Sequence, residues 1–179
     1  FLGYSDNTNL TFLLPTICDI TAIYSPCAPA YGMEPWHPSL KDTFELLTGK
    51  SNMAHGYDKW EKESVKNEEN PLVPYNVTKK TEIKKFGAGK DDAKTEISGR
   101  LIGGCLGCLS NLAGTKFDKV SDFNEKYKED GIIWFMESCD LNPMAIRRAI
   151  WQLDHAGWFK YVKGFLIGRP LCLDEEILG

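Results

Sequence analysis

The sequence lacks any uncharged apolar run long enough to cross a membrane. A bilayer-spanning helix needs about 18 or more consecutive apolar residues, and the longest candidate, residues 101–115, is half glycine and other small residues. The sequence also lacks an excess of basic side chains, since 21 Lys and Arg stand against 25 Asp and Glu, for a net charge of −4. Proteins that follow nucleic-acid phosphates usually carry the opposite balance. We therefore expect neither a membrane span nor a nucleic-acid partner.

Cysteine is too scarce for a disulfide framework in a chain of 179 residues. The six cysteines sit inside apolar runs, so we expect small buried thiols of a cytosolic protein. They are Cys18, Cys27, Cys105, Cys108, Cys139 and Cys172. The Cys105–Cys108 pair has no second Cys or His pair that would complete a zinc site, so we expect no metal.

The chain divides by composition into three stretches. Residues 1–50 are apolar with proline-rich loops, residues 51–94 are polar and lysine-rich, and a regular apolar pattern follows from residue 95. We interpret the middle stretch as a solvated linker or insertion, with a short strand at 81–85. Because the chain starts with Phe1, in what reads as the end of a strand, we expect it to begin inside a larger protein.

The last stretch has the pattern of an α/β domain. Residues 132–136 are five consecutive apolar residues, typical of a parallel strand covered on both faces. Asn142 and Pro143 start a helix that ends at Gly157, and residues 161–168 form a second buried strand. This order predicts a right-handed strand–helix–strand crossover. A further strand at 99–103 and a helix at 106–112 belong to the same α/β domain.

The first candidate for chemistry is Ser5, in Gly3-Tyr4-Ser5-Asp6-Asn7. A serine between a strand end and a helix start has the geometry of a nucleophile elbow, in which a sharp turn exposes the hydroxyl and the next amide faces a developing oxyanion. The usual pattern has glycine two positions after the serine, where this sequence has Asn7. The alternative is that Ser5 or Asp6 caps the helix, since Ser and Asp are among the commonest N-caps.

The second candidate is Glu137, directly after the predicted strand at 132–136. Catalytic groups gather at the carboxyl ends of parallel strands. There Glu137 would orient a histidine that takes a proton from the serine. Alternatively, it caps the next helix through the turn at 138–140.

The three histidines do not complete this arrangement. His37 and His55 lie in a loop and in the polar stretch, and His155 lies near the end of the helix that starts at Asn142, where the helix dipole favours it. None follows a predicted strand.

These motifs occur in the order seen in one family. They are Gly3-Tyr4-Ser5-Asp6, Tyr24-Ser25-Pro26, residues 99–104, Gly114-Thr115, the strand ending in Glu137, residues 148–153 and Gly157. In this order the chain resembles the LD-carboxypeptidase family, serine peptidases that include muropeptide-recycling enzymes and microcin C self-immunity peptidases. The resemblance implies an α/β fold in which the remainder of an N-terminal α/β domain (1–50) and a linker (51–94) precede most of a C-terminal α/β domain (95–179).

The resemblance also implies roles for individual residues. Ser5 matches the nucleophile, Glu137 the acidic member of a Ser-His-Glu triad, and the Asp6 backbone amide one oxyanion donor. The family's histidine lies further downstream of its glutamate, and its second oxyanion amide precedes the serine, so both would lie outside this chain. The family commonly has asparagine where Cys105 stands. No cofactor is implied.

The polar stretch resembles the longer members of the microcin-immunity branch, in which an aromatic residue stacks on a nucleobase. Trp60, Tyr75 and Phe86 are the candidates for this substrate contact, and each could equally pack the loop against the protein.

The predicted function is a cytoplasmic serine carboxypeptidase or amidase that cleaves an amide next to a free carboxylate. The substrate would be a peptidoglycan tetrapeptide or a microcin-like aminoacyl nucleotide, and the full-length protein would be a homodimer. The alternative is a non-catalytic binding module on the same scaffold. Because the histidine would lie outside these 179 residues, we expect the chain alone to be inactive.

Overall fold

The computed structural model describes residues 1–87, 91 and 95–170. The chain folds into two units: the first combines Phe1–Tyr24 with the chain from Glu96 onward, and the second is Ser25–Thr95. These units differ in extent from the stretches 1–50, 51–94 and 95–179. The boundaries of those stretches refer to the domains of the resembled family, and they stay a prediction.

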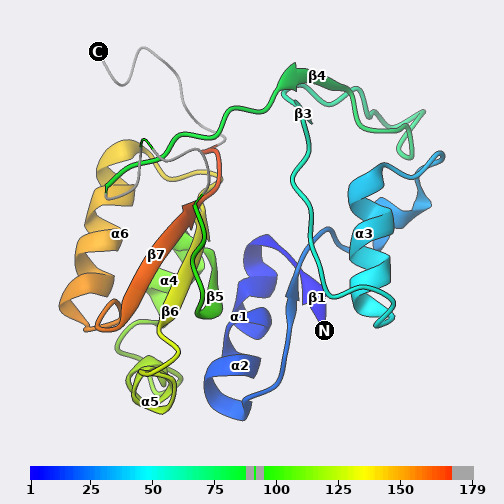
Figure 1. The fold of residues 1–179 in the computed structure, drawn as a ribbon. Helices are drawn as coiled ribbons and strands as arrows, with labels where there is room; N and C mark the ends of the chain where they lie inside the picture. Colours follow the sequence, from blue (N-terminus) through cyan, green and yellow to red (C-terminus); the bar gives the residue numbers. More distant parts are fainter. Residues whose placement is uncertain (88–90, 92–94, 171–179) are drawn as a thin grey trace. The chain divides into compact units, whose positions relative to one another are not determined.

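The first unit is built on a parallel three-stranded sheet in the order β5-β6-β7 (Figure 1). The strands are β5 (Arg100–Cys105), β6 (Ile132–Glu137) and β7 (Val162–Ile167). In the register between β5 and β6, Arg100 pairs with Ile132 and Cys105 with Glu137. The predicted α/β class and parallel strand–helix–strand unit are confirmed.

Two of the three helices between these strands begin where the sequence predicts them, at Leu106 and Pro143, and the third, at Val120, was not predicted. Helix α4 (Leu106–Leu112) follows β5 without a loop, and α5 (Val120–Lys126) precedes β6. Helix α6 (Pro143–His155) joins β6 to β7. Its N-cap, Asn142, accepts a hydrogen bond from the Ala145 N–H at 2.9 Å, and Pro143 occupies the first turn, where no amide donor is needed.

The N-terminal segment contributes short elements to the same unit. In chain order these are β1 (Leu2–Gly3), the 3-10 turn η1 (Ser5–Asn7), α1 (Thr8–Thr11), α2 (Leu13–Cys18) and β2 (Ile23–Tyr24). Strands β1 and β2 pair in parallel, so that Gly3 lies opposite Tyr24. Helix α1 contacts both β5 and α4.

The core of the first unit is centred on three stacked aromatic side chains. Phe12 stacks on Trp158 with ring centroids 5.2 Å apart, and Trp134 stacks on Trp158 at 5.6 Å. All three side chains are buried. Because they come from α2's N-cap, from β6 and from the segment after α6, this cluster joins the N-terminal segment to the sheet.

The sheet is not buried evenly. Strand β6 is covered, as predicted for residues 132–136. The strand predicted at 161–168 is present as β7, but the prediction that it is buried is wrong, because most of β7 is exposed and Ile167 is 64% accessible. Both β5 and β7 are at edges of the described sheet, but β5 is also contacted by α1 and α4, whereas β7 pairs with β6 only in the described part of the chain.

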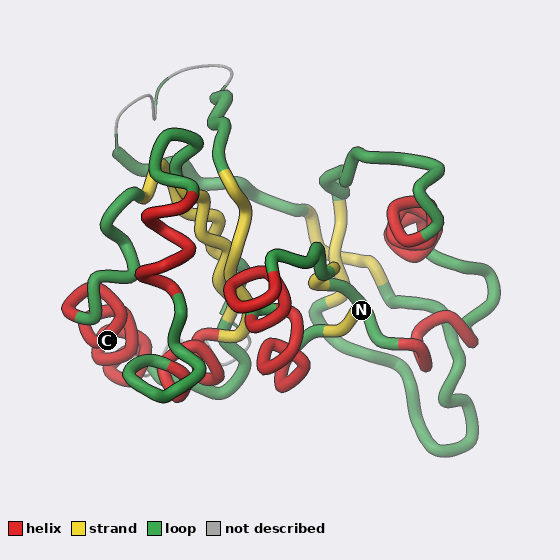
Figure 2. The backbone as a smooth tube through the Cα atoms, turned by 90° about the horizontal axis from the view of Figure 1, so that it is seen from below, coloured by secondary structure: helices red, strands yellow, loops and turns green. Residues whose placement is uncertain are grey.

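The second unit is mostly loop (Figure 2). It contains the 3-10 helix η2 (Ala28–Gly32), helix α3 (Pro38–Leu47) and an antiparallel pair, β3 (Lys59–Glu61) and β4 (Val77–Lys80). The short strand predicted at 81–85 is wrong, since β4 ends at Lys80. His37 is the N-cap of helix α3, where its Nδ1 accepts from the Ser39 N–H at 3.2 Å, and Pro38 is the first residue of the helix.

No helix in the described part of the chain combines the length and the apolar character needed to cross a bilayer.

Strand β5 contains two glycines at points of close approach. A Cβ atom on Gly103 would lie 1.7 Å from the Phe135 carbonyl oxygen, and one on Gly104 would lie 2.6 Å from the Thr8 Oγ1 atom. Their φ angles of +153° and +150° are also ones that side-chain-bearing residues rarely adopt. Glycine at these positions therefore lets β6 and α1 reach β5.

We expect Gly103→Ala to lower the free energy of unfolding by about 2 kcal/mol or more, because the clash is with backbone that cannot rotate away. Gly107→Ala is the matched control. Its new Cβ would lie 3.9 Å from the Cys105 Sγ, which is ordinary van der Waals contact and not a clash. Alanine favours the helix, so Gly107→Ala should change stability by less than about 1 kcal/mol, in the stabilising direction. Urea unfolding of both variants measures the difference, and equal stabilities would contradict the close approach.

Candidate active site

Ser5 lies in a strained turn between β1 and α1. Tyr4 is extended, and Ser5 has a φ of +56°, in the left-handed region that a serine rarely occupies. A residue in this conformation costs about 1–3 kcal/mol and persists only where its surroundings impose it. The combination of strand, left-handed serine and helix is the geometry of a nucleophile elbow.

The turn explains why Asn7 is tolerated where such elbows usually have glycine. A Cβ atom on Gly3 would lie 2.6 Å from the Asn7 Cβ. The residues two before and two after Ser5 therefore touch, and it is Gly3 that leaves the space. In this turn, the glycine two residues before the serine leaves the space that a glycine two residues after it leaves in the usual pattern.

The structure does not support the alternative in which Ser5 or Asp6 caps the helix. The N-cap of η1 is Tyr4 and that of α1 is Asn7, and neither makes a side-chain cap hydrogen bond. Asp6 instead receives a hydrogen bond at its Oδ1 from the Cys108 thiol, at 3.5 Å.

Tyr24 connects Ser5 to Glu137. The Ser5 N–H donates to the Tyr24 hydroxyl at 2.8 Å, and this hydroxyl donates to the Glu137 Oε1 atom at 2.5 Å. The Tyr24 ring packs against Phe135, with centroids 5.3 Å apart. Two residues that are 132 positions apart in the sequence are thus held by one oxygen.

Glu137 occupies the position that the sequence predicts, at the carboxyl end of β6. Since its Oε1 accepts from Tyr24 and α6 is capped by Asn142, the alternative in which Glu137 caps that helix is wrong. The connecting role of Tyr24 was not predicted from the sequence, where this residue stood out only as part of a motif.

Burial and the neighbouring carboxylate both raise the pKa of Tyr24 far above the ordinary value of 10. Burial is the larger cause, because it disfavours the phenolate. The hydrogen bond to Glu137 adds to it, because ionisation would place two negative charges in contact. Tyr24 therefore stays protonated and remains a donor at neutral pH.

Thr8 extends the network to β5. Its Oγ1 accepts from the Cys105 N–H at 2.9 Å, and its hydroxyl also bonds to Tyr24. Thr8 is fully buried, so these bonds replace the water that its oxygen loses on folding. Gly104, which lacks a Cβ, makes the space that Thr8 needs.

The Cys108 thiol beside the turn is not activated. Burial, followed by the proximity of Cys105 and Asp6, raises the pKa of Cys108 to about 12. A thiol with this pKa is a poor nucleophile at neutral pH. Cys105 is buried at the β5–α4 junction as predicted, but the expectation of buried thiols is wrong for Cys18 and Cys139, which are exposed. Cys172 lies outside the described residues.

The first unit contains one histidine, His155, and it lies in the last turn of α6 as predicted. Its Nδ1 bonds to the Trp151 carbonyl at 2.9 Å, and its ring stacks on the Trp151 ring. His37 and His55 belong to the second unit, where His37 caps α3 and His55 pairs with Asp42 at 3.3 Å.

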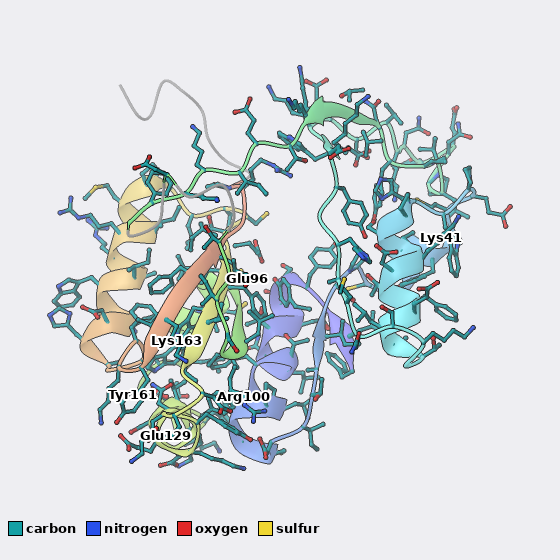
Figure 3. The ribbon with its side chains drawn as sticks, in the orientation of Figure 1. Lys41, Glu96, Arg100, Glu129, Tyr161 and Lys163 are labelled. Atoms are coloured by element: carbon teal, nitrogen blue, oxygen red, sulfur yellow. The ribbon has the colours of Figure 1, made fainter. Side chains whose placement is uncertain are left out.

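A cavity of about 330 Å³ lies beside β5 in the first unit, and neither Ser5 nor Glu137 is among its lining residues. Arg100 and Asp19 line it, and ion pairs bind them to Asp130 at 2.6 Å and to Lys126 at 2.7 Å. Arg100 begins β5 and lies toward α5 (Figure 3). Because the strands are parallel, these charges are at the opposite end of the sheet from Glu137.

The three aromatic candidates for substrate binding belong to the second unit. The Trp60 indole donates to the Lys80 carbonyl at 3.2 Å, the Tyr75 ring contacts the His37 ring, and the Phe86 side chain is 85% exposed. Their substrate-binding role stays a prediction. Within residues 1–87, 91 and 95–170, no group of three potential His, Cys, Asp or Glu ligands gathers around a metal position.

Comparison with known proteins identifies the family. Residues 98–176 match the LD-carboxypeptidase C-terminal domain. The chain is also 30% identical over 182 residues to the microcin C7 self-immunity protein MccF of Escherichia coli, a match that covers 97% of this chain and 48% of MccF. The chain carries the C-terminal domain of the LD-carboxypeptidase family. The resemblance inferred from the motifs is confirmed.

Solved structures show that LD-carboxypeptidase relatives share this fold. MccF in complex with aspartyl sulfamoyl adenosine has a TM-score of 0.65 at 22% identity, covering 99% of this chain and 53% of that one. A muramoyltetrapeptide carboxypeptidase from Oxalobacter formigenes has a TM-score of 0.56 at 20% identity, covering 100% of this chain and 49% of that one. The chain thus spans about half the length of these LD-carboxypeptidase relatives.

Removal of the Thr8 hydroxyl should destabilise the first unit. We expect Thr8→Val to lower the free energy of unfolding by about 1–3 kcal/mol, because the buried Cys105 N–H loses its acceptor. Thr16→Val is the control: the Thr16 hydroxyl donates to the Phe12 carbonyl, which also accepts from the Thr16 N–H, so we expect a change below about 1 kcal/mol. Denaturant unfolding measures both, and equal losses would contradict the network.

The raised pKa of Tyr24 predicts a pH dependence of stability. Above pH 10 the unfolded chain loses the Tyr24 proton while the folded chain keeps it, so stability falls as the pH rises. The contribution of Tyr24 is fully present below pH 10. We expect the unfolding free energy of the wild type to fall more steeply between about pH 9.5 and 11 than that of Tyr24→Phe. Parallel curves in chemical denaturation at these pH values would contradict the raised pKa.

Proposed function

We propose that the whole protein is a serine peptidase of the LD-carboxypeptidase type in which Ser5 is the nucleophile and Glu137 the acidic triad member. Family membership supports peptidase chemistry. The observation that carries the assignment to these residues is the left-handed Ser5 turn, joined to Glu137 through the Tyr24 hydroxyl.

In the proposed reaction, the Ser5 hydroxyl attacks the carbonyl carbon of an amide next to a free carboxylate. A histidine, at the position that the family has downstream of its glutamate, takes the serine proton and passes it to the leaving nitrogen as the carbon–nitrogen bond breaks. Water then hydrolyses the acyl-enzyme and restores Ser5. Glu137 would orient this histidine and stabilise its charged form.

The Asp6 amide is the proposed oxyanion donor. Asp6 is the second residue of the one-turn helix η1, and the first amides of a helix have no acceptor within it. The Ser5 amide donates to Tyr24 instead. A second donor would come from the loop that precedes the serine in the family.

Two substrate classes fit an amide beside a free carboxylate. The relative MccF has been solved with aspartyl sulfamoyl adenosine and with glutamyl sulfamoyl guanosine, and another similar protein is a muramoyltetrapeptide carboxypeptidase. We therefore propose an aminoacyl nucleotide or a peptidoglycan tetrapeptide as substrate. Trp60, Tyr75 or Phe86 would stack on the nucleobase of the first. A homodimer, a cytoplasmic location and catalysis without a cofactor complete the proposal.

The test uses the whole protein with both substrate classes. We expect Ser5→Ala to lower kcat by about a thousandfold or more, because the acyl-enzyme can no longer form. The matched control is Ser110→Ala, whose hydroxyl donates to the Gly107 carbonyl within α4, and it should retain wild-type kcat. Release of the C-terminal amino acid or of the nucleotide is followed by chromatography.

The outcomes separate the enzyme from a binding module on the same scaffold. Turnover retained in Ser5→Ala would remove Ser5 from the mechanism. Tight binding of aspartyl sulfamoyl adenosine by the wild type, without turnover of either substrate class, would favour the module. The same assay on the 179-residue chain tests the expectation that it is inactive alone.

A further inference from the structure

The Tyr24 hydroxyl makes hydrogen bonds that hold neighbouring groups in place. A phenol has two acceptor lone pairs and one proton. The Tyr24 oxygen accepts from the Ser5 N–H at 2.8 Å and bonds to the Thr8 hydroxyl, and its proton goes to the Glu137 Oε1 atom at 2.5 Å. All of its hydrogen-bonding capacity is therefore used on three residues from η1, α1 and β6.

The ring that carries this hydroxyl is itself fixed. Tyr24 is the last residue of β2, which pairs in parallel with β1 so that Tyr24 lies opposite Gly3. Its ring packs against Phe135, the second residue before Glu137 on β6. Backbone pairing at one end and ring packing at the other leave the hydroxyl little freedom to move.

We propose that Tyr24 is a positioning residue for the hydrolysis, holding the Glu137 carboxylate and the Ser5 turn in one fixed arrangement. This inference rests on the proposed roles of Ser5 and Glu137. Tyr24 acts through these two residues and does not itself exchange a proton with the substrate.

Two consequences for catalysis follow from the bonds of Tyr24. The Ser5 N–H is used in the bond to Tyr24 and is not left as an oxyanion donor, and the strained φ of Ser5 is held by a hydrogen bond from outside the turn. The Glu137 carboxylate is held by its Oε1 atom, so the direction of its other oxygen is also fixed. A misplacement of about 1 Å in such an arrangement costs about a hundredfold in rate.

The test is Tyr24→Phe in the whole protein, with Tyr161→Phe as the matched control. Tyr161 also donates a hydrogen bond to a carboxylate, the Glu125 Oε1 atom at 2.9 Å, but it lies toward the α5 end of the sheet (Figure 3). We expect Tyr24→Phe to lower kcat by about 10- to 100-fold with KM changed less than about threefold. Tyr161→Phe should keep both constants.

The pH profile separates positioning from a structural role. When the hydrogen bond from Tyr24 is removed, more negative charge stays on the Glu137 oxygen that faces the general base. This charge stabilises the protonated form of the base and so raises the pKa of the base. The acid limb of the kcat/KM profile should therefore move to higher pH in Tyr24→Phe. A variant that is only less stable would keep the wild-type limb at temperatures where it is folded.

A second variant keeps the test decisive if Tyr24→Phe does not fold. Site-specific incorporation of 3-fluorotyrosine at position 24 preserves the shape and strengthens the donor, so kcat should stay close to that of the wild type and the acid limb should move to lower pH. An unmoved limb in this variant, or wild-type kcat and pH profile in folded Tyr24→Phe, would overturn the positioning role. If Ser5→Ala also retained turnover, the proposed function itself would have failed.

Discussion

The structure of the candidate site depends on one oxygen atom, the hydroxyl of Tyr24. It joins the turn that carries Ser5, the helix that carries Thr8 and the strand that ends in Glu137. A buried polar group left without a partner costs about 1–3 kcal/mol. Each of these hydrogen bonds therefore contributes more to stability when the others are present. The network therefore behaves as a unit, and its members are held with less freedom than separate surface hydrogen bonds would allow.

This network exists because α1 can approach β5 closely. Gly104 leaves the space for the Thr8 side chain, and Gly103 leaves the space for the Phe135 carbonyl. The stacked rings of Phe12, Trp134 and Trp158 supply the apolar contact that holds the N-terminal segment there. Packing thus supports the left-handed Ser5 turn, whose conformation is unfavourable by itself.

The sequence predicted the parts of the site that depend on local patterns. The apolar run at 132–136 located β6, and with it Glu137, because a strand covered on both faces needs apolar residues at every position. Asn142 and Pro143 located the start of α6 through cap chemistry. Tyr24 could not be found in this way. Its partners lie 19 and 113 positions away, and β2, with two residues, is too short for a periodic pattern. The exposure of β7 was missed for a related reason, since an apolar run does not reveal whether a strand is central or at an edge.

Charged side chains have different partners at the two ends of the sheet, and this difference matters for the proposed catalysis. At the Arg100 end, exposed ion pairs such as Arg100–Asp130 and Lys126–Asp19 lie in water, which screens them. At the Glu137 end, the described partner of the carboxylate is a neutral hydroxyl whose proton cannot leave at neutral pH. A neutral donor orients Glu137 without cancelling its charge, whereas a lysine or arginine would compete with any cation that approached. Tyr24 thus fixes the direction of the Glu137 carboxylate through an uncharged donor, which is the arrangement that the proposed triad requires of its acidic member.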